Sequence, residues 1–370
     1  MVTEPLEDPG LRLDCIGISH RTAASELRER AAFSASLLRE ALSAARREPR
    51  IERLVIIATC HRTELYAETP VSSADAGTTL LEWWARTCGV APAALTPHAY
   101  ALTGFEAARH LFRVAAGLDS VVLGEAQIVA QVASALRQSV SVHAASPLLK
   151  LAFKSAVRSG ERARGRVWGR LQAASLGSAA VDAAAAVAGG LEGRNVVVVG
   201  AGEIAELALR SLAAHKPARI TVANRTLETA LELGSHHGAD ACPLNLLPSA
   251  IQAADVVIAA TRATRVLIDR ASAVAALERR PTRPLTFVDV SLPRNIAIAV
   301  RDVPGARLIG IDDLGTYISF AHTERRAVVP EVEKIVDEEL DLLRVRLAQH
   351  GIRRPVNTTR MSPSPATLAI

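Results

Sequence analysis

Hydrophobic positions in the first third of the chain alternate between strand-like runs and helical spacing. The apolar stretch at 13–19 and the β-branched run at 54–58 each predict a strand. Between them, Ser25 stands where the N-cap of a helix is expected. We therefore expect an antiparallel α+β unit over roughly residues 12–140, with Cys60 in the loop that joins two strands.

A different pattern follows a long alanine-rich helical region at residues 145–190. Strand-like runs then alternate with helical stretches, which is typical of a parallel sheet with crossover helices. The predicted strands of this sheet are residues 195–199, 220–223, 254–260 and 285–290.

The C-terminal part carries an amphipathic helix. Its apolar residues recur at steps of three and four, with charged residues between them, and form a seam narrow enough for a partner helix. The residues of this seam are Val332, Val336, Leu340, Leu343 and Leu347. The segment 351–370 is rich in Pro, Ser and Thr, and we expect it to be a disordered tail.

Composition limits the class of protein. With 49% hydrophobic and 22% charged residues the chain is globular. It has neither an apolar run of about 18 residues nor a signal-peptide pattern, so we expect a cytoplasmic protein without a membrane segment. The cysteines show no CxxC spacing, and we predict no metal site; they are Cys15, Cys60, Cys88 and Cys242.

A dinucleotide-binding turn follows the first strand of the parallel sheet. The sequence Gly200-Ala201-Gly202-Glu203-Ile204-Ala205 comes directly after a run of four valines and opens a helix. The first glycine permits the tight turn, the second lets the backbone approach the pyrophosphate, and the small third residue permits close helix–strand packing. This context predicts a nicotinamide dinucleotide rather than a structural turn.

The next strand bears on the choice of cofactor. It ends at Asn224-Arg225-Thr226, without the carboxylate that binds a ribose 2′-hydroxyl in NAD-preferring domains. Arg225 is placed to pair with a 2′-phosphate, and Asn224 and Thr226 to donate hydrogen bonds to it. The alternative is an ordinary strand-end loop with a solvated arginine. We predict NADPH.

Cys60 has the sequence environment of a reactive thiol. His61 is adjacent and Arg62 lies two residues on, and positive charge near a thiol lowers its pKa. A buried, inert thiol is the alternative. A cysteine together with NADPH predicts attack on an activated acyl group, a thioester intermediate and its reduction to an aldehyde.

At these residues the chain resembles the glutamyl-tRNA reductase family of tetrapyrrole (porphyrin) synthesis. The ordered matches include GISHRTA at 17–23, ATCHRTELYA at 58–67, GLDSVVLGEAQIVAQV at 117–132, VVVVGAGEIAELA at 196–208, ANRT at 223–226, DVSLPRNI at 289–296 and IDDL at 311–314. The resemblance implies four parts. These are an N-terminal catalytic domain (11–158), a Rossmann-type NADPH domain with a linker helix (159–315), a dimerisation helix (316–350) and the tail (351–370).

The resemblance also implies roles for residues. Cys60 would attack the ester of glutamyl-tRNA, and NADPH would reduce the thioester to glutamate-1-semialdehyde, the precursor of 5-aminolevulinate. Arg62 would be the natural partner of the glutamate carboxylate. The remaining substrate-binding residues would be Thr59, His61, Ser120, Glu125, Ala126, Gln127 and Gln131. The family further implies a homodimer and, as a possible partner, glutamate-1-semialdehyde aminomutase.

Several positions depart from the family pattern. His61 replaces an asparagine, Ala126 replaces a proline, and Leu102 stands where the family has a functionally important histidine. The segment 163–167 (ARGRV) replaces VRTET. Two alternatives therefore stay open: a diverged reductase for another aminoacyl-tRNA or acyl carrier, and a non-catalytic homologue that binds tRNA or pathway partners.

One cationic stripe accompanies these motifs. Lys150, Lys154, Arg158 and Arg162 recur every fourth residue, so a helix aligns them on one face. Such a face is expected opposite a polyanion, here a tRNA backbone, and a solvated basic face is the alternative.

Overall fold

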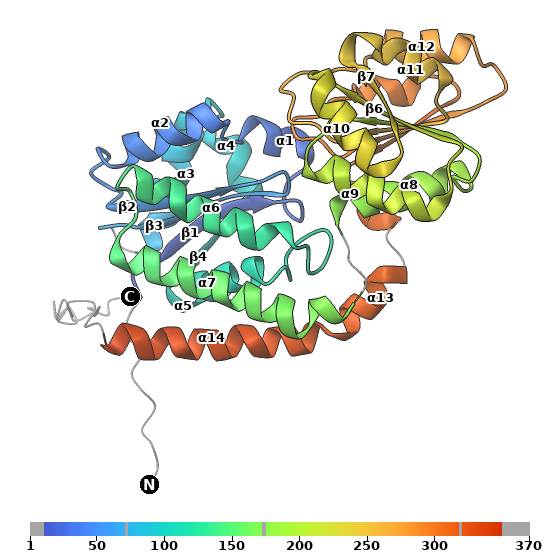
Figure 1. Cartoon of the computed structure of the whole chain (residues 1–370). Helices are drawn as coiled ribbons and strands as arrows, with labels where there is room; N and C mark the ends of the chain where they lie inside the picture. Colours follow the sequence, from blue (N-terminus) through green and yellow to red (C-terminus); the bar gives the residue numbers. More distant parts are fainter. Residues whose placement is uncertain (1–10, 71–72, 172–174, 318–319, 350–370) are drawn as a thin grey trace, which may run out of the picture.

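The computed structural model describes residues 11–70, 73–171, 175–317 and 320–349. Two domains are followed by a C-terminal helix that returns to the first (Figure 1). The first contains a four-stranded antiparallel sheet in the order β2-β3-β1-β4, and the second a six-stranded parallel sheet in the order β10-β9-β8-β5-β6-β7. The predicted α+β unit followed by a parallel α/β domain is confirmed.

The antiparallel sheet is covered on both faces, which explains its continuous apolar runs. Neighbouring residues point to opposite sides, so that Cys15 and Val55 enter one hydrophobic cluster and Ile16 and Ile56 the other. The strands are β1 (Asp14–Ser19), β2 (Arg53–Ala58), β3 (Arg62–Glu68) and β4 (Tyr100–Thr103). The helices of this domain are α1 (Ser25–Arg30), α2 (Ala35–Ala45), α3 (Ser73–Cys88), α4 (Pro92–Leu95), α5 (Gly104–Ala115), α6 (Gln127–Ser141) and α7 (Pro147–Arg166).

Helix α7 runs unbroken through Gly160. A Cβ atom at this position would lie 2.4 Å from the carbonyl oxygen of Ala115, so the glycine lets α7 approach α5 closely. Ala163, Val167 and Trp168 belong to the hydrophobic cluster of the N-terminal domain. The last turns of α7 therefore pack with that domain.

The parallel sheet is also buried on both faces. Val196 and Val198 enter one cluster and Val197 and Val199 the other, because side chains alternate along β5. The strands are β5 (Asn195–Val199), β6 (Arg219–Asn224), β7 (Asp240–Pro243), β8 (Val256–Ala259), β9 (Leu285–Asp289) and β10 (Ala306–Gly310). The helices are α8 (Leu176–Ala188), α9 (Glu203–Leu212), α10 (Leu227–His237), α11 (Leu247–Ala253) and α12 (Arg270–Glu278).

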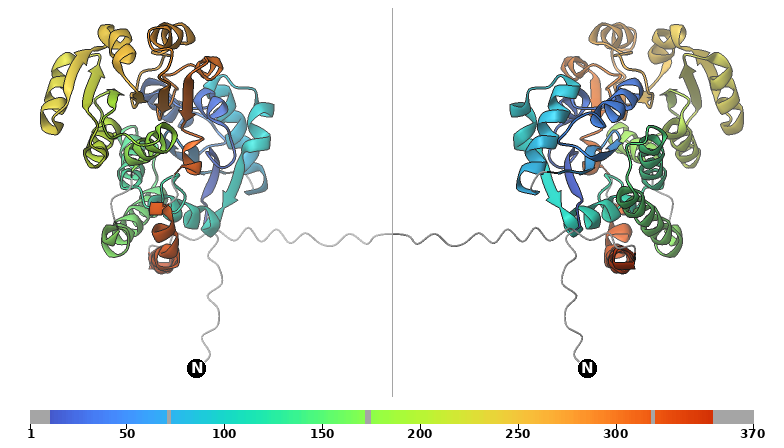
Figure 2. Two further views of the ribbon diagram at one scale, coloured as in Figure 1. Left: turned by 90° about the vertical axis from the view of Figure 1, so that its right-hand side faces the viewer. Right: turned by 90° about the vertical axis from the view of Figure 1, so that its left-hand side faces the viewer.

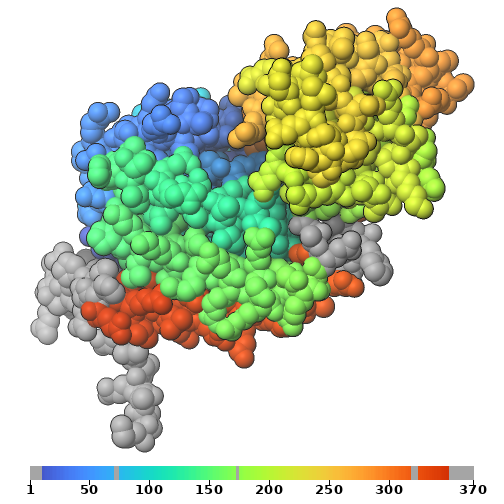
Figure 3. Space-filling model, viewed as in Figure 1, coloured from blue at the N-terminus to red at the C-terminus, as the bar shows by residue number. Residues whose placement is uncertain are grey.

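The C-terminal helices are α13 (Phe320–Ala327) and α14 (Val329–Gln349), and the apolar seam of α14 is filled by its own chain. All five seam residues are buried in the cluster of the N-terminal domain. The helix lies along α7 in the ribbon and space-filling views, on the side of the domain opposite α2 (Figures 1, 2 and 3). The interpretation of this seam as the contact for a partner helix is therefore corrected: α5 and α7 occupy it.

The basic stripe on α7 is corrected for a related reason. Arg158 and Arg162 form ion pairs with Glu339, each at 2.9 Å, and Arg162 also pairs with Glu338 of α14 at 2.5 Å. These two arginines hold an acidic helix of the same chain and do not present a free face to a polyanion.

The predicted disordered tail at 351–370 lies outside the described residues. Within the described ranges, no helix is both long enough and apolar enough to cross a membrane.

Candidate active site

Cys60 lies in the tight loop between β2 and β3, as the sequence predicts. The Thr59 hydroxyl accepts hydrogen bonds from the backbone N–H groups of His61 and Arg62, each at 3.2 Å. The Thr59 N–H in turn donates to the Arg62 carbonyl at 2.8 Å. Thr59 thus closes the turn on which Cys60 stands.

Arg62, at the start of β3, is held inside the domain. Its side chain is 1% exposed and pairs with Glu64 at 2.7 Å, and its other terminal nitrogen donates to the Asp119 carbonyl oxygen. Burial alone would raise the pKa of Glu64, but Arg62 and His110 outweigh it and hold that pKa well below its usual range. Glu64 also accepts hydrogen bonds from Tyr66 and Tyr100, so a saturated network supports the base of the Cys60 loop.

Arg21 is the more accessible cation of this network. Its guanidinium pairs with the Asp119 carboxylate at 2.9 Å, while the side chain remains 53% exposed. Arg62 has both terminal nitrogens engaged, so it would meet a substrate carboxylate only by sharing them. Arg21 also has both terminal nitrogens engaged, the second with the Leu118 carbonyl at 3.5 Å, but its side chain is accessible to a substrate.

The expectation that positive charge lowers the pKa of Cys60 is wrong for this structure. Burial, with a further contribution from Glu125, raises the pKa of the thiol to about 12. Arg28 and Arg62 act in the opposite direction but do not outweigh burial. Cys60 is therefore a protonated thiol at neutral pH and needs a base when it reacts.

Glu125 is the carboxylate whose charge acts on the Cys60 thiol. It is buried in the loop before α6, and burial followed by the charge of Glu203 raises the pKa of its carboxyl to about 7. Glu203 begins α9, the helix after the dinucleotide turn. Cys60 and Val122 of the first domain also join the hydrophobic cluster centred on the second. The thiol loop and the dinucleotide turn therefore meet where the two domains contact.

The geometry of the turn at 200–205 fits a dinucleotide. Gly200 has φ +112°, and a Cβ atom there would lie 2.3 Å from the carbonyl oxygen of Ala260. Gly202 is the N-cap of α9, and Ala205 is fully buried beneath it. Ala201 and Ile204 are half-buried against the same cluster, and Glu203 is exposed. Backbone N–H groups at the start of α9 are thus left accessible to a pyrophosphate.

Arg225 and Thr226, after β6, are exposed, and the Asn224 side-chain amide donates to the Thr226 carbonyl at 3.0 Å. Arg225 lines a cavity of about 580 Å³ together with Arg265, from the loop after β8. Its other walls are mainly apolar and include Pro243 and Leu247. Two guanidinium groups beside an apolar wall suit a phosphorylated adenosine.

The other predicted substrate residues follow one another along a single segment. Ser120 is buried next to Asp119 in the α5–α6 loop. Ala126 is the exposed N-cap of α6, and Gln127 and Gln131 are half-buried on its first two turns. Their role in binding a substrate stays a prediction.

Comparison with known families divides the chain at the same place as the fold. Residues 16–167 match the family described as the glutamyl-tRNAGlu reductase N-terminal domain. Residues 182–317 match the family described as shikimate / quinate 5-dehydrogenase. A thiol-bearing domain of the first kind thus precedes a dehydrogenase-type domain.

Relatives that extend over both domains decide the family. A glutamyl-tRNA reductase from Thermus thermophilus is 40% identical over 347 residues, which cover 94% of this chain and 83% of the relative. One from Pelotomaculum thermopropionicum is 36% identical over 326 residues, covering 88% and 73%. The chain belongs to the glutamyl-tRNA reductase family. Among solved structures, the glutamyl-tRNA reductase from Methanopyrus kandleri matches with TM-score 0.50 and 31% identity, over 92% of this chain and 81% of that one.

One departure from the glutamyl-tRNA reductase pattern is explained by its position. Leu102 pairs with Cys15 across β4 and β1 and packs against the hydrophobic core, so a hydrophobic side chain suits its surroundings. His98 lies before β4 and contacts the Thr22 carbonyl at 2.7 Å. His110 of α5 contacts the buried Glu64 at 2.9 Å.

Three residues near the site were missed by sequence reasoning. Arg28 contacts the Cys60 carbonyl oxygen, Asp312 contacts Arg28, and Arg265 lines the same cavity as Arg225. Asp312 lies within the IDDL motif, to which the sequence assigns no role. Arg28 and Arg265 are single arginines in an arginine-rich chain, so the sequence does not set them apart from the other arginines.

Proposed function

We propose that the protein reduces glutamyl-tRNA to glutamate-1-semialdehyde with NADPH, through a thioester on Cys60, as the first step of tetrapyrrole synthesis. Membership of the glutamyl-tRNA reductase family supports the reaction. The observation that carries it is the meeting of the Cys60 loop, Glu125 and the start of α9 at one domain boundary.

The residues of the chain divide the acyl-transfer step between them. Glu125, with a pKa of about 7, takes the proton of the Cys60 thiol. The sulfur attacks the ester carbonyl carbon, the bond from that carbon to the ribose oxygen breaks, and the proton passes to the departing tRNA hydroxyl. Thr59, His61, Ser120, Gln127 and Gln131 surround the glutamyl group, with Arg21 or Arg62 near its carboxylate.

NADPH, when bound, would supply the hydride that converts the thioester into an aldehyde and releases Cys60 as a thiolate, which then takes up a proton. The turn at 200–205 would hold its pyrophosphate. Arg225, with Asn224, Thr226 and Arg265, would hold its 2′-phosphate, and this pair of arginines supports NADPH over NADH.

We further propose a cytoplasmic homodimer that passes its product to an aminomutase, because a free α-amino aldehyde is reactive. All four cysteines are free, which accords with a reducing compartment. Since the α14 seam is filled, a dimer would need another surface, for which the exposed Leu342 and Val345 of α14 are candidates. Light scattering of the purified protein measures the oligomeric state.

The deciding experiment uses purified protein with charged glutamyl-tRNA. We expect mass spectrometry to find a glutamyl adduct on Cys60 without NADPH, and aldehyde only after NADPH is added. Cys60→Ser removes the aldehyde. A protein that forms neither adduct nor aldehyde refutes the proposal.

A second candidate is a reductase for another aminoacyl-tRNA or a carrier-bound acyl group. It is favoured by Leu102, a hydrophobic residue where the family has its histidine. An adduct that forms only with a different charged tRNA or acyl carrier selects this candidate. Cofactor or tRNA binding without any adduct selects a non-catalytic homologue.

A further inference from the structure

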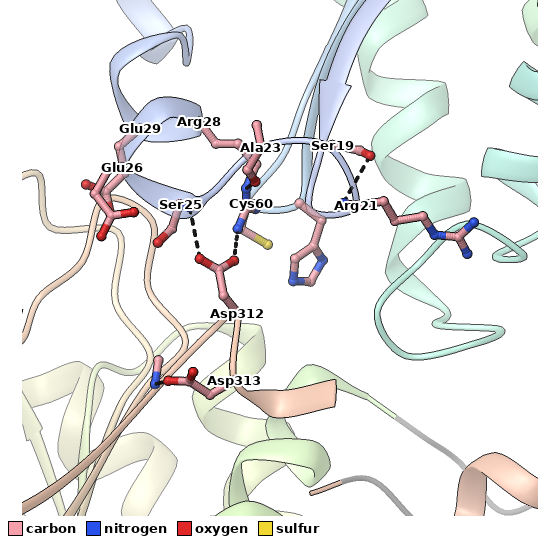
Figure 4. Close-up of polar contacts among 12 residues, drawn as sticks. Ser19, Arg21, Ala23, Ser25, Glu26, Arg28, Glu29, Cys60, Asp312 and Asp313 are labelled. Atoms are coloured by element: carbon pink, nitrogen blue, oxygen red, sulfur yellow. Dashed lines mark hydrogen bonds and ion pairs between the residues drawn. The ribbon is translucent and has the colours of Figure 1, made fainter. Parts of the chain in front are cut away.

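Arg28 of α1 connects the thiol loop to the second domain. Its side chain is 2% exposed. One terminal nitrogen donates to the Cys60 carbonyl oxygen, the other pairs with the Asp312 carboxylate, and Nε donates to the Ala23 carbonyl at 3.2 Å (Figure 4). A single buried guanidinium thus touches both the nucleophile's backbone and a residue of the cofactor domain.

Asp312 has a second contact with α1. Its other carboxylate oxygen accepts a hydrogen bond from the backbone N–H of Ser25 at 2.9 Å. Asp312 follows β10, and 284 positions separate it from Arg28. Both of its oxygens are therefore used across the domain boundary.

Arg294 makes a parallel set of contacts from the loop after β9. Its guanidinium pairs with Glu26 at 2.7 Å and with Glu29 at 3.3 Å. Its backbone N–H donates to the Glu29 carboxylate at 3.0 Å. The short helix α1 is thus held by the cofactor domain at two points, and one of them leads to Cys60.

Separation of the domains would change the state of Arg28. Without Asp312 its buried positive charge would lose its carboxylate partner, and an unpaired buried charge is costly. The guanidinium would have to turn toward water or another acid, and its hydrogen bond to the Cys60 carbonyl would be released. Asp312 stabilises the thiol loop only when the domains are in contact.

Resting on the proposed function, we propose that Arg28 and Asp312 are positioning residues that fix the Cys60 loop for the reductive half of the reaction. Acyl transfer needs the thiol loop and the tRNA ester, both of which the first domain can bring together. Reduction also needs the second domain in place, and the Arg28–Asp312 contact forms only then. Loss of this contact should slow reduction more than acylation.

The test separates the two half-reactions in the full-length protein. Asp312→Asn keeps the shape and the bond to the Ser25 N–H but removes the charge that pairs with Arg28. We expect glutamyl-adduct formation without NADPH to change less than about threefold, and single-turnover reduction of the adduct to slow about tenfold or more. X-ray scattering without any substrate should show a larger radius of gyration than for the wild type.

Asp313 supplies the matched control. It is the next residue, but its carboxylate accepts from the Gly310 N–H at 2.8 Å and pairs with Arg301, both in its own domain. Asp313→Asn should leave the ratio of the two rates and the radius of gyration unchanged. Arg28→Lys, which retains the charge but not the forked geometry, should resemble Asp312→Asn.

Equal slowing of both steps in Asp312→Asn would show a merely structural role, and unchanged reduction would show no role; either overturns the inference. If the wild type forms no adduct, the proposed function fails instead. In that case X-ray scattering and the rate of Cys60 alkylation in Asp312→Asn test the domain contact without turnover. A radius of gyration and an alkylation rate equal to those of the wild type refute the inference.

Discussion

The Arg158 guanidinium and the Glu339 carboxylate form an ion pair at 2.9 Å between α7 and α14, although the Glu339 side chain is only 1% exposed. Arg162 contacts the other oxygen of the same carboxylate at 2.9 Å. A buried carboxylate held by two arginines binds the C-terminal helix to the first domain.

Charge reversal at this pair tests whether the stripe holds α14. Arg158→Glu would place a second carboxylate against the buried Glu339, and we expect the free energy of unfolding to fall by about 3 kcal/mol or more. Urea unfolding measures the loss. Lys154→Glu, at an exposed position on the same helix, should change it by less than about 0.5 kcal/mol. Equal stability of the two variants would contradict the role of Arg158.

The second prediction concerns the thiol and its acidic neighbour. The pKa of Cys60 is raised to about 12, so its alkylation by iodoacetamide should keep accelerating from pH 7 to pH 10 without a plateau. Glu125→Gln removes a negative charge that raises this pKa. We expect alkylation to be several-fold faster in that variant at pH 8, where the wild-type carboxyl, with a pKa of about 7, is mostly ionised.

Enzyme turnover in the same variant should move the other way, since the glutamine cannot accept the thiol proton. Adduct formation with glutamyl-tRNA should therefore fall while alkylation rises. A carboxylate introduced by Gln127→Glu should not restore adduct formation to the Glu125→Gln variant. The side chain at position 127, on α6, is more exposed than the one at position 125. If alkylation and adduct formation change in the same direction, Glu125 is not the base.

The local parts of this structure could be predicted from the sequence. Apolar runs gave the strands, and the turn at 200–205 is determined by the conformation of Gly200 and the small size of Ala205. The loop position of Cys60 followed from the strands on either side. Each of these features depends on residues that are close together in the chain.

The contacts between distant segments could not be predicted in the same way. The spacing of Val332 and Leu340 shows that something apolar covers α14, but not whether it is another copy or the same chain. Acidic residues between 331 and 339 pair with arginines of α5, of α7 and of the segment after α7, and this complementary charge is a signal that the sequence carries. The raised pKa of Cys60 depends on burial at a domain contact, which neighbouring residues do not reveal.

The third prediction is that His20 and His61 contribute a loss of stability between pH 7 and pH 5, against a gain from Glu125, whose raised pKa makes the folded protein bind a proton that the unfolded chain does not. Burial first, and then nearby arginines, lowers the pKa of His20 to about 4, and burial lowers that of His61 well below its ordinary value. Nδ1 of His20 and Nε2 of His61 are buried without a hydrogen-bond partner among the described residues. The unfolded chain therefore takes up protons below pH 6.5 that the folded protein refuses, and folding weakens as pH falls.

For His20 alone this difference corresponds to about 2 kcal/mol at pH 5. Urea unfolding at pH 7 and pH 5 measures it. The double variant His20→Asn, His61→Asn should lose this contribution, so that its stability relative to the wild type rises as pH falls from 7 to 5. His236→Asn, at an exposed position on α10, is the control and should retain the wild-type difference. A double variant with an unaltered pH dependence would contradict the assignment.

The last prediction concerns the choice between NADPH and NADH. Arg225 and Arg265 approach the same cavity from different loops, so each should contribute a charge-assisted hydrogen bond to a 2′-phosphate and nothing comparable to a 2′-hydroxyl. At these exposed positions we expect each alanine variant to raise the Kd for NADPH about tenfold, with little change for NADH. Arg262→Ala, on the same loop as Arg265 but outside the lining of the cavity, is the control. Fluorescence titration measures all the constants without tRNA, so the result does not depend on turnover. An equal rise in the Kd for NADPH and for NADH would place the adenosine elsewhere. A residue that contacts only the shared parts of the two molecules cannot discriminate between them.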